Sequence, residues 1–198
     1  MTHRPTPASD LSLPRCRWCG SDPLYVRYHD EEWAVPVRDD ARLFEMLLLE
    51  GAQAGLSWIT VLRKRDRYRQ AFDGFDAERM ALYDAKRIDA LMQDAGIVRH
   101  RGKIEAFVGN ARAYLAMGGG RGALTDLVWA SAADGPRRRT GRGPVPVRTA
   151  ESEALSRALV ARGFKFVGPT ICYAFMQAVG VVDDHEPHCF RAHDAAVV

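Results

Sequence analysis

Apolar residues recur every three or four positions along most of the chain, and this spacing predicts amphipathic helices. One helix is expected behind Asp39 and Asp40, which are good N-cap residues, and a second begins at Ser57 and runs to Phe72. The further helices are expected over residues 84–95, 101–117, 124–130, 149–162 and 169–179. Gly96, Gly163 and Gly180 follow three of them as expected stops, and Pro169 suits a first helical turn. The sequence has no convincing alternating strand and no internal repeat, so the predicted fold class is all-α.

The length of 198 residues corresponds to one domain, and 47% hydrophobic with 27% charged residues is the profile of a soluble globular protein. We expect a flexible N-terminal tail over residues 1–14, a folded domain over 15–190 and a C-terminal tail over 191–198. Within the domain, residues 131–148 form an aperiodic loop rich in Arg, Gly and Pro. No apolar run approaches the ~20 residues of a membrane span, and the polar N-terminus does not resemble a secretory signal. These features predict a cytoplasmic protein without a membrane partner.

The formal net charge is +3, and its distribution is uneven. Residues 136–148 include five arginines and no acidic residue, so the rest of the chain is close to neutral. Such a cluster can bind nucleic acid, but its Gly and Pro content is more typical of a solvated linker.

Cysteine and histidine residues gather near the two ends of the chain. Cys16, Cys19 and His29 lie near the start, and His185, His188 and Cys189 lie near the end. A structural zinc ion takes four Cys or His ligands, and the spacing here permits several choices that would join the two ends. Ordinary thiols and solvated histidines are the alternative. A redox Cys-x-x-Cys is less favoured because no βαβ pattern surrounds it.

Residues 96–103 connect two amphipathic helices and resemble a helix-hairpin-helix element. A glycine-rich hairpin can present backbone N–H groups to a DNA phosphate, and Arg99, Arg101 and Lys103 would add positive charge. An ordinary helix–helix connection is the alternative.

A group of aromatic residues could stack on a purine base, and a cationic base would gain a cation–π contribution of roughly 0.5–2 kcal/mol. The group comprises Trp18, Tyr25, Tyr28, Trp33 and Trp58, with Glu50 as a carboxylate that could read an exocyclic amine. From the residues alone, core packing of the rings and a surface position for Glu50 are favoured.

Four segments together resemble one family. They are Asp22–Trp33, Leu49–Trp58, Asp94–Lys103 and Arg162–Tyr173. In this order, they closely resemble the bacterial 3-methyladenine DNA glycosylase I family, and the similarity runs from about Cys16 to Cys189. Ala34 and Ala52 stand where members of the family commonly carry Gly and Gln.

The resemblance implies a helix-hairpin-helix glycosylase fold with one structural Zn²⁺ per chain. Its ligands would be Cys16, His29, His185 and Cys189, so that Cys19 and His188 would not bind the metal, and the metal would lie remote from catalysis. Glu50 would be the catalytic residue, Tyr28 and Trp58 would sandwich the base, and Trp18 and Tyr25 would line the wall. The implied DNA-binding residues are Arg99, Arg101, Gly102, Lys103, Gly55 and Leu56.

The implied activity is the hydrolytic release of 3-methyladenine, with 3-methylguanine as a second candidate substrate, from alkylated double-stranded DNA. The nucleotide would have to be flipped out of the duplex. We expect a monomeric, monofunctional enzyme without lyase activity, in which Asp126 has no catalytic role and Lys103 contacts phosphate. The rival interpretations are a zinc-stabilised DNA-binding module, which has no use for Glu50, Trp58 and Tyr28 together, and a zinc hydrolase, which needs an open coordination position.

Overall fold

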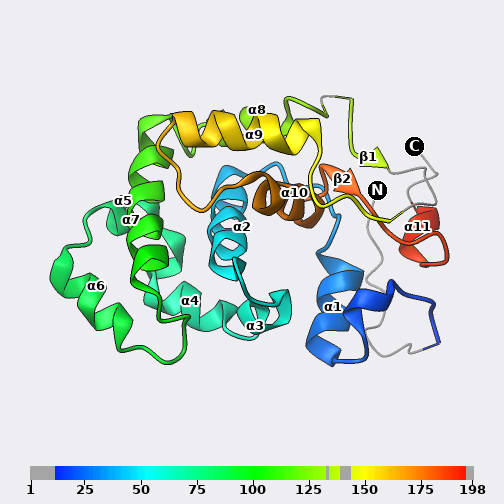
Figure 1. The fold of residues 1–198 in the computed structure, drawn as a ribbon, viewed down its shortest axis with the longest axis horizontal. Coiled ribbons are helices and arrows are strands. Elements are labelled where there is room, and N and C mark those ends of the chain that lie inside the picture. The colour runs from blue at the N-terminus through cyan, green and yellow to red at the C-terminus, as the bar shows by residue number, and fades with distance from the viewer. Residues whose placement is uncertain (1–11, 133, 139–143, 195–198) are drawn as a thin grey trace.

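The computed structural model describes residues 12–132, 134–138 and 144–194, and these are mostly helical (Figure 1). The helices are α1 (Pro23–Glu31), α2 (Asp40–Gln53), α3 (Trp58–Leu62), α4 (Arg65–Ala71), α5 (Ala77–Ala81), α6 (Ala85–Met92), α7 (Arg101–Ala116), α8 (Ala123–Trp129), α9 (Ala150–Ala161), α10 (Pro169–Ala178) and α11 (Arg191–Asp194). Two 3-10 turns, η1 (Arg17–Cys19) and η2 (Asp73–Phe75), accompany them. The prediction of a helical fold is therefore confirmed. It missed two short parallel strands, β1 (Arg137–Arg138) and β2 (Val182–Asp183), in which Arg137 pairs with Val182.

Most of the expected helix boundaries are confirmed by side chains that cap the helices. The carboxylates of Asp39 and Asp84 accept hydrogen bonds from the backbone N–H groups of α2 and α6, and Thr149 forms a reciprocal capping box with Ser152 at α9. Pro169 occupies the first turn of α10 as predicted.

Two boundaries were predicted wrongly. The expected helix from Ser57 to Phe72 is divided into α3 and α4, because the polar residues Arg63 and Lys64 form a turn between two separate apolar faces. α6 ends at Met92 rather than at Gly96, whose backbone N–H binds the carboxylate of Asp94 in a local turn.

Helix α2 is the centre of the core and packs against α3, α7, α8 and α10 (Figure 1). Leu43, Phe44, Leu47 and Leu48 are buried, as their helical spacing predicts. At its start the buried carboxylate of Asp40 accepts hydrogen bonds from Gly122 and Thr125 at the beginning of α8. The other end of α2 carries Glu50 toward the site described below.

The two ends of the folded chain meet. The N–H of Phe190 donates to the carbonyl of Pro14 at 2.8 Å, and the N–H of Arg17 donates to the Glu186 carboxylate at 2.9 Å. Residues 191–194, expected to belong to a C-terminal tail, form the short helix α11, in which Ala192 is buried. None of the described helices combines the length and the apolar character that crossing a membrane requires.

Candidate active site and metal centre

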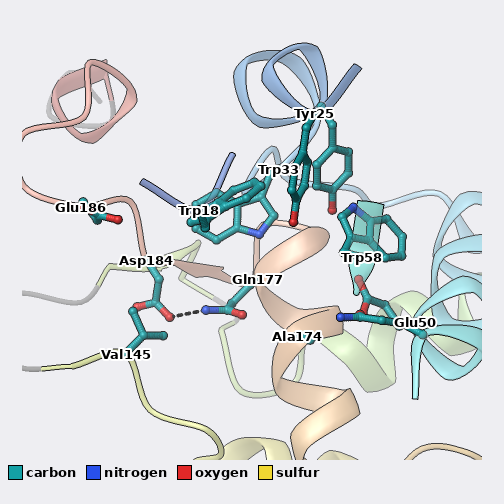
Figure 2. Close-up of a pocket in the computed structure, with 12 residues that line it drawn as sticks. Trp18, Tyr25, Trp33, Glu50, Trp58, Val145, Ala174, Gln177, Asp184 and Glu186 are labelled. Atoms are coloured by element: carbon teal, nitrogen blue, oxygen red, sulfur yellow. Dashed lines mark hydrogen bonds between the residues drawn. The ribbon is translucent and has the colours of Figure 1, made fainter. Parts of the chain in front are cut away.

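A cavity of about 280 Å³ opens between α1, α2, α3 and α10, near the lower end of the range for small-molecule sites. Its lining residues are Trp18, Tyr25, Tyr28, Trp33, Glu50, Gln53, Trp58, Val145, Ala174, Gln177, Asp184 and Glu186. Figure 2 shows the aromatic rings on one side of this pocket and Glu50, Gln177 and Asp184 on the other. The structure thus brings Glu50 and the four expected base-binding residues into one site.

Glu50 is a buried acid without a partner. Its side chain reaches the pocket from the last turn of α2, the residue is 3% exposed, and its Oε2 atom makes no hydrogen bond with the described residues. Burial raises the pKa of this carboxyl from 4.5 to about 8, so that in the empty pocket it is mostly protonated at neutral pH. A buried carboxyl that lacks a partner is expensive, which favours a ligand-binding role over a structural one.

The aromatic residues form a connected wall. Trp18 contacts Tyr25 and Trp33 edge to face, each with a ring-centroid distance of 5.0 Å, and Tyr28 contacts Trp58 at 5.3 Å with an interplanar angle of 48°. A ring stacked between two others lies about 3.5–4.0 Å from each of them, so the two outer rings must be separated by about twice that distance. The rings of Tyr28 and Trp58, with centroids 5.3 Å apart, are too close together for this. The expected sandwich of the base between Tyr28 and Trp58 is therefore not formed in this structure. The indole Nε1 of Trp58 is buried without a hydrogen-bond partner among the described residues, so it is available as a donor.

Gln177 and Asp184 add a polar side to the pocket that sequence reasoning missed. The amide Nε2 of Gln177 donates to Asp184 Oδ2 at 2.7 Å, and the Tyr173 hydroxyl donates to the same oxygen at 2.6 Å. This arrangement fixes the orientation of the Gln177 side chain. The available signal was weak: Tyr173 and Gln177 are four residues apart and therefore share one face of α10.

Cys16, His29, His185 and Cys189 form a buried cluster whose ligand atoms all lie within 4.8 Å of one another, close enough for a single metal ion. Cys19 and His188 are outside it, and His188 Nε2 lies 3.0 Å from the carbonyl of Arg15. The hydrogen bond between the two sulfur atoms raises the pKa of Cys16 and lowers the pKa of Cys189.

Both histidines are oriented by a carboxylate. Nδ1 of His29 lies 2.7 Å from Asp30, Nδ1 of His185 lies 2.7 Å from Asp183, and the buried Nε2 of His185 has no partner in the described structure. Metal-binding histidines use this arrangement, because a carboxylate that accepts the Nδ1 proton leaves Nε2 free to bind.

The cluster of Cys16, His29, His185 and Cys189 directly contacts the aromatic wall of the pocket. Trp18 lies 5.3 Å from the ring of His29, and Trp33 lies 4.6 Å from the ring of His185. The cluster expected to lie remote from the base pocket is thus separated from it by a single layer of aromatic rings.

Residues 93–100 connect α6 to α7, and Lys103, in the first turn of α7, is placed differently from the prediction. Lys103 is only 7% exposed, and its ammonium donates to the carbonyls of Ala52 and Ala54 at 2.8 and 2.6 Å. Its side chain therefore holds the end of α2 in place instead of reaching out to phosphate. The position of Lys103 one helical turn before the buried Phe107 was a sign of this orientation.

The other expected DNA-binding residues lie near the surface. Arg99, Gly55 and Leu56 are exposed, and Gly102 is half-buried. Arg101 is also exposed, but its guanidinium pairs with Asp89 at 2.5 Å. Gly55 has a φ of 78°, which glycine adopts without strain.

Asp126 and the described arginines of residues 136–148 do not line the pocket, although Val145 of the same segment does. Asp126 is exposed on α8, beside the start of α2, and it does not line the pocket. In the arginine-rich segment, Arg137 and Arg138 form β1, and Arg137 pairs with Glu151 at 3.2 Å. Residues 139–143, with Arg139 and Arg142, lie outside the described residues.

Comparison with known proteins agrees with this geometry. Residues 18–192 match the model of the methyladenine glycosylase family. The chain is 52% identical to DNA-3-methyladenine glycosylase 1 of Escherichia coli over 179 residues, which are 89% of this chain and 96% of that protein. It is 50% identical to DNA-3-methyladenine glycosylase of Haemophilus influenzae over 181 residues, covering 88% and 96%.

Solved structures show the same relationship. A crystal structure of 3-methyladenine DNA glycosylase I matches with a TM-score of 0.86 and 51% identity, over 89% of this chain and 98% of that one. The Staphylococcus aureus enzyme, whose structure describes the recognition of 3-methyladenine, matches with a TM-score of 0.84 and 35% identity, over 89% and 95%. The chain therefore belongs to the methyladenine glycosylase family, whose members hydrolyse N-glycosidic bonds.

Proposed function

We propose that this protein excises 3-methyladenine from alkylated DNA, with Glu50 as the residue that recognises the damaged base. The observation that carries the proposal is the buried, unpartnered carboxyl of Glu50 in a pocket lined by aromatic rings. A purine can stack on the Tyr28–Trp58 pair or on the wall of Trp18 and Tyr25. In each case the carboxylate can accept a hydrogen bond from the exocyclic amine of the base.

The pKa of Glu50 supplies a mechanism of selection. In the empty pocket the carboxyl is mostly neutral at pH 7, because burial raises its pKa to about 8. A positively charged base stabilises the ionised form of Glu50, so that the carboxyl releases its proton when the base binds. Normal adenine offers the same amine but no positive charge, and therefore does not stabilise the ionised form in this way. The aromatic rings favour the same base, since a cation–π interaction stabilises the positively charged methylated base and not neutral adenine.

The chemistry demands little acid catalysis. Methylation at N3 gives the base a positive charge, so that the C1′–N9 bond breaks with its electron pair passing to N9. The base then leaves neutral, and water adds to C1′ and gives up its proton. The protein's contribution is to hold the extrahelical nucleotide, to exclude bulk water and to place a negative charge near the departing base. We propose a monofunctional enzyme without lyase activity, because the ammonium of Lys103 is held by the carbonyls of Ala52 and Ala54. 3-Methylguanine stays a second candidate substrate.

The partner would be double-stranded DNA, bound by a monomer in the cytoplasm. Arg99, Gly102 and the turn of Gly55 and Leu56 provide the contact surface. Lys103 contributes indirectly, because it joins α7 to the turn that carries Gly55. Arg101 is weakened as a phosphate contact by its pairing with Asp89.

We further propose that the cluster of Cys16, His29, His185 and Cys189 binds one zinc ion with a structural role. Two thiols and two carboxylate-oriented imidazoles are the ligand types that zinc prefers, and four protein ligands complete a tetrahedron. When bound, the ion joins the two ends of the chain and leaves no open position for metal-assisted hydrolysis. This closed set argues against a zinc hydrolase, and the pocket with Glu50 argues against a module that only binds DNA.

Base release from methylated DNA, analysed by chromatography, tests the proposed activity. Titration of free 3-methyladenine by NMR or fluorescence tests the pocket. Because a charge-assisted hydrogen bond contributes roughly 1.5–3 kcal/mol, Glu50→Gln should weaken binding about ten- to a hundredfold, and Trp58→Ala should cause a comparable loss through stacking. Unchanged binding and excision by Glu50→Gln would show that the pocket assignment is wrong. Binding to undamaged duplex, which depends on phosphate contacts, should change little in both variants.

A further inference from the structure

The loop between α9 and α10 holds a strained aromatic residue on the surface. Phe166 has a φ of 56°, in the left-handed region that a residue with a Cβ atom adopts only at an energetic cost. Its side chain is nevertheless 36% exposed, while its neighbours Phe164 and Val167 are buried. The strain therefore does not serve to bury Phe166 in the core. Strain of this kind is concentrated at functional sites.

Several buried contacts enforce this conformation. The amide of Asn110, on α7, brackets the backbone of Lys165: its Nδ2 donates to the Lys165 carbonyl at 3.0 Å and its Oδ1 accepts from the Lys165 N–H at 2.8 Å. Ser156 Oγ donates to the Val167 carbonyl at 2.7 Å. The backbone is thus fixed on both sides of Phe166, and this directs its side chain toward the surface.

Phe166 lies between the two segments that we propose to contact DNA. Its ring is 6.2 Å from that of His100, edge to face, and its Cζ would lie 4.0 Å from a Cβ atom at Gly102. Its backbone approaches α2 at Gly51, where a Cβ atom would lie 3.3 Å from both the Cβ and the carbonyl oxygen of Phe166. Gly51 follows Glu50 and begins the segment that leads to the turn at Gly55. The hairpin, the end of α2 and Phe166 therefore form one continuous surface.

Charge on this surface suits DNA. Lys165 is exposed beside Phe166, and its ammonium makes no hydrogen bond or ion pair with the described residues 12–132, 134–138 and 144–194. Arg99, on the hairpin, is exposed as well. The nearby acids Asp89 and Glu105 lie close to Arg101 and are partly neutralised by it.

We infer that Lys165 and Phe166 form a further DNA-contacting element, an inference that rests on the proposed function. Phe166 packs against a base or deoxyribose that is uncovered when the damaged nucleotide leaves the stack, and Lys165 contacts a neighbouring phosphate. Apolar side chains can support an opened base step in this way, and aromatic rings stack on bases without regard to sequence. The element would stabilise the opened duplex without touching the base inside the pocket.

The test is fluorescence anisotropy with a duplex that contains one stable abasic-site analogue, which presents the opened stack without a base to excise. Phe166→Ala should weaken this binding about five- to a hundredfold. Phe166→Gly should weaken binding to this duplex by a similar factor. Because glycine adopts a φ of 56° without strain, this variant separates the loss of the ring from a folding defect in Phe166→Ala. Lys165→Ala should lower the slope of log K against log salt by about 0.9. The control is Leu82→Ala, since Leu82 is 82% exposed but follows α5, away from the hairpin, and this variant should bind like the parent.

Free 3-methyladenine should bind all four variants as it binds the parent. If Phe166→Ala weakened free-base and duplex binding equally, Phe166 would act by supporting Gly51 and Glu50, and the inference would be overturned. Parental duplex binding by both Phe166 variants would overturn it as well. Failure of the parent itself to bind free base or to release it from methylated DNA would instead refute the proposed function, since the abasic duplex reports on Phe166 independently of excision.

Discussion

Replacing Glu50 with Gln should stabilise the empty protein at neutral pH while it impairs recognition. Burial raises the pKa of the folded-state carboxyl from 4.5 to about 8, so the folded protein holds a proton that the unfolded chain releases. Between these two pKa values the unfolded state binds fewer protons than the folded state, and stability therefore falls as pH rises, by roughly 1.4 kcal/mol per pH unit. Below the unfolded pKa this contribution is fully present, and above the folded pKa it is fully lost. At pH 7 the accumulated cost is on the order of 3 kcal/mol.

Glu50→Gln removes this pH-dependent cost but adds an amide donor that has no partner in the pocket. An unsatisfied buried donor costs about 1–3 kcal/mol, so we expect a net gain of about 1 kcal/mol at pH 7 and a small loss below pH 5. The slope of the stability difference against pH is the more robust quantity, because the amide introduced by Glu50→Gln contributes equally at every pH. The free energy of unfolding of the variant minus that of the parent should rise steadily from pH 5 to pH 8.

Urea denaturation of both proteins across this pH range measures the difference, with the metal content held equal. Glu105→Gln is the matched control, because the Glu105 side chain on α7 is 52% exposed and its replacement should leave the pH dependence of the parent unchanged. A difference between Glu50→Gln and the parent that does not vary with pH would refute the reasoning. It would mean that Glu50 is already ionised in the empty pocket, and the selection mechanism based on its neutral form would fail.

Three further predictions concern residues around the pocket. Purified protein should contain one equivalent of zinc, and a Cys16→Ala/Cys189→Ala double variant should lose it. This variant should have a lower Tm, measured by calorimetry, and weaker base binding, measured by fluorescence. Full metal occupancy in the variant would contradict the assignment. Lys103→Ala should reduce the free energy of unfolding by about 1–3 kcal/mol, because the carbonyls of Ala52 and Ala54 lose their donor. A variant as stable as the parent in urea would show that Lys103 does not hold the end of α2 and is free to contact DNA phosphate. Ala34→Gly should raise stability by about 0.5–1 kcal/mol, because Ala34 has a φ of 60°, and a loss of stability in urea would show that this strain is absent in solution.

Helix positions could be predicted from the sequence wherever a helix has both a capping side chain and an apolar face. Asp39, Asp84 and Thr149 mark their helices because their side chains bind the first free N–H groups whatever the rest of the fold does. The short helices α1 and α5 were missed. α5 is only five residues long, and α1 buries the polar residues His29 and Asp30 beside Val26 and Tyr28, so its buried face is not marked by apolar spacing.

The pocket could be predicted only in part, because its composition depends on contacts between distant segments. Glu50 and the aromatic residues were found through the resemblance to a family, whereas their spacing alone favoured an ordinary core. Asp184 and Gln177 were missed because their roles follow from one hydrogen bond between α10 and the segment after β2. The burial of Lys103 was missed for a related reason: a charged residue on the apolar face of a helix needs acceptors, and those acceptors lie about fifty residues earlier in the chain.

The arrangement of the metal cluster and the pocket explains how the protein tolerates an active site that reduces its stability. Glu50 Oε2 and the indole N–H of Trp58 are buried without partners among the described residues, and such groups favour a local rearrangement that would bring them water. Trp18 and Trp33, which line the same pocket, pack against His29 and His185, whose orientations are fixed by Asp30 and Asp183. A metal ion on these histidines would make the aromatic wall rigid and so keep the pocket open and dry until a base enters. With the proposed metal bound, the rigid aromatic wall would preserve the unfavourable burial of the Glu50 carboxyl, and binding of a cationic base would then recover the free energy that this burial costs the folded protein.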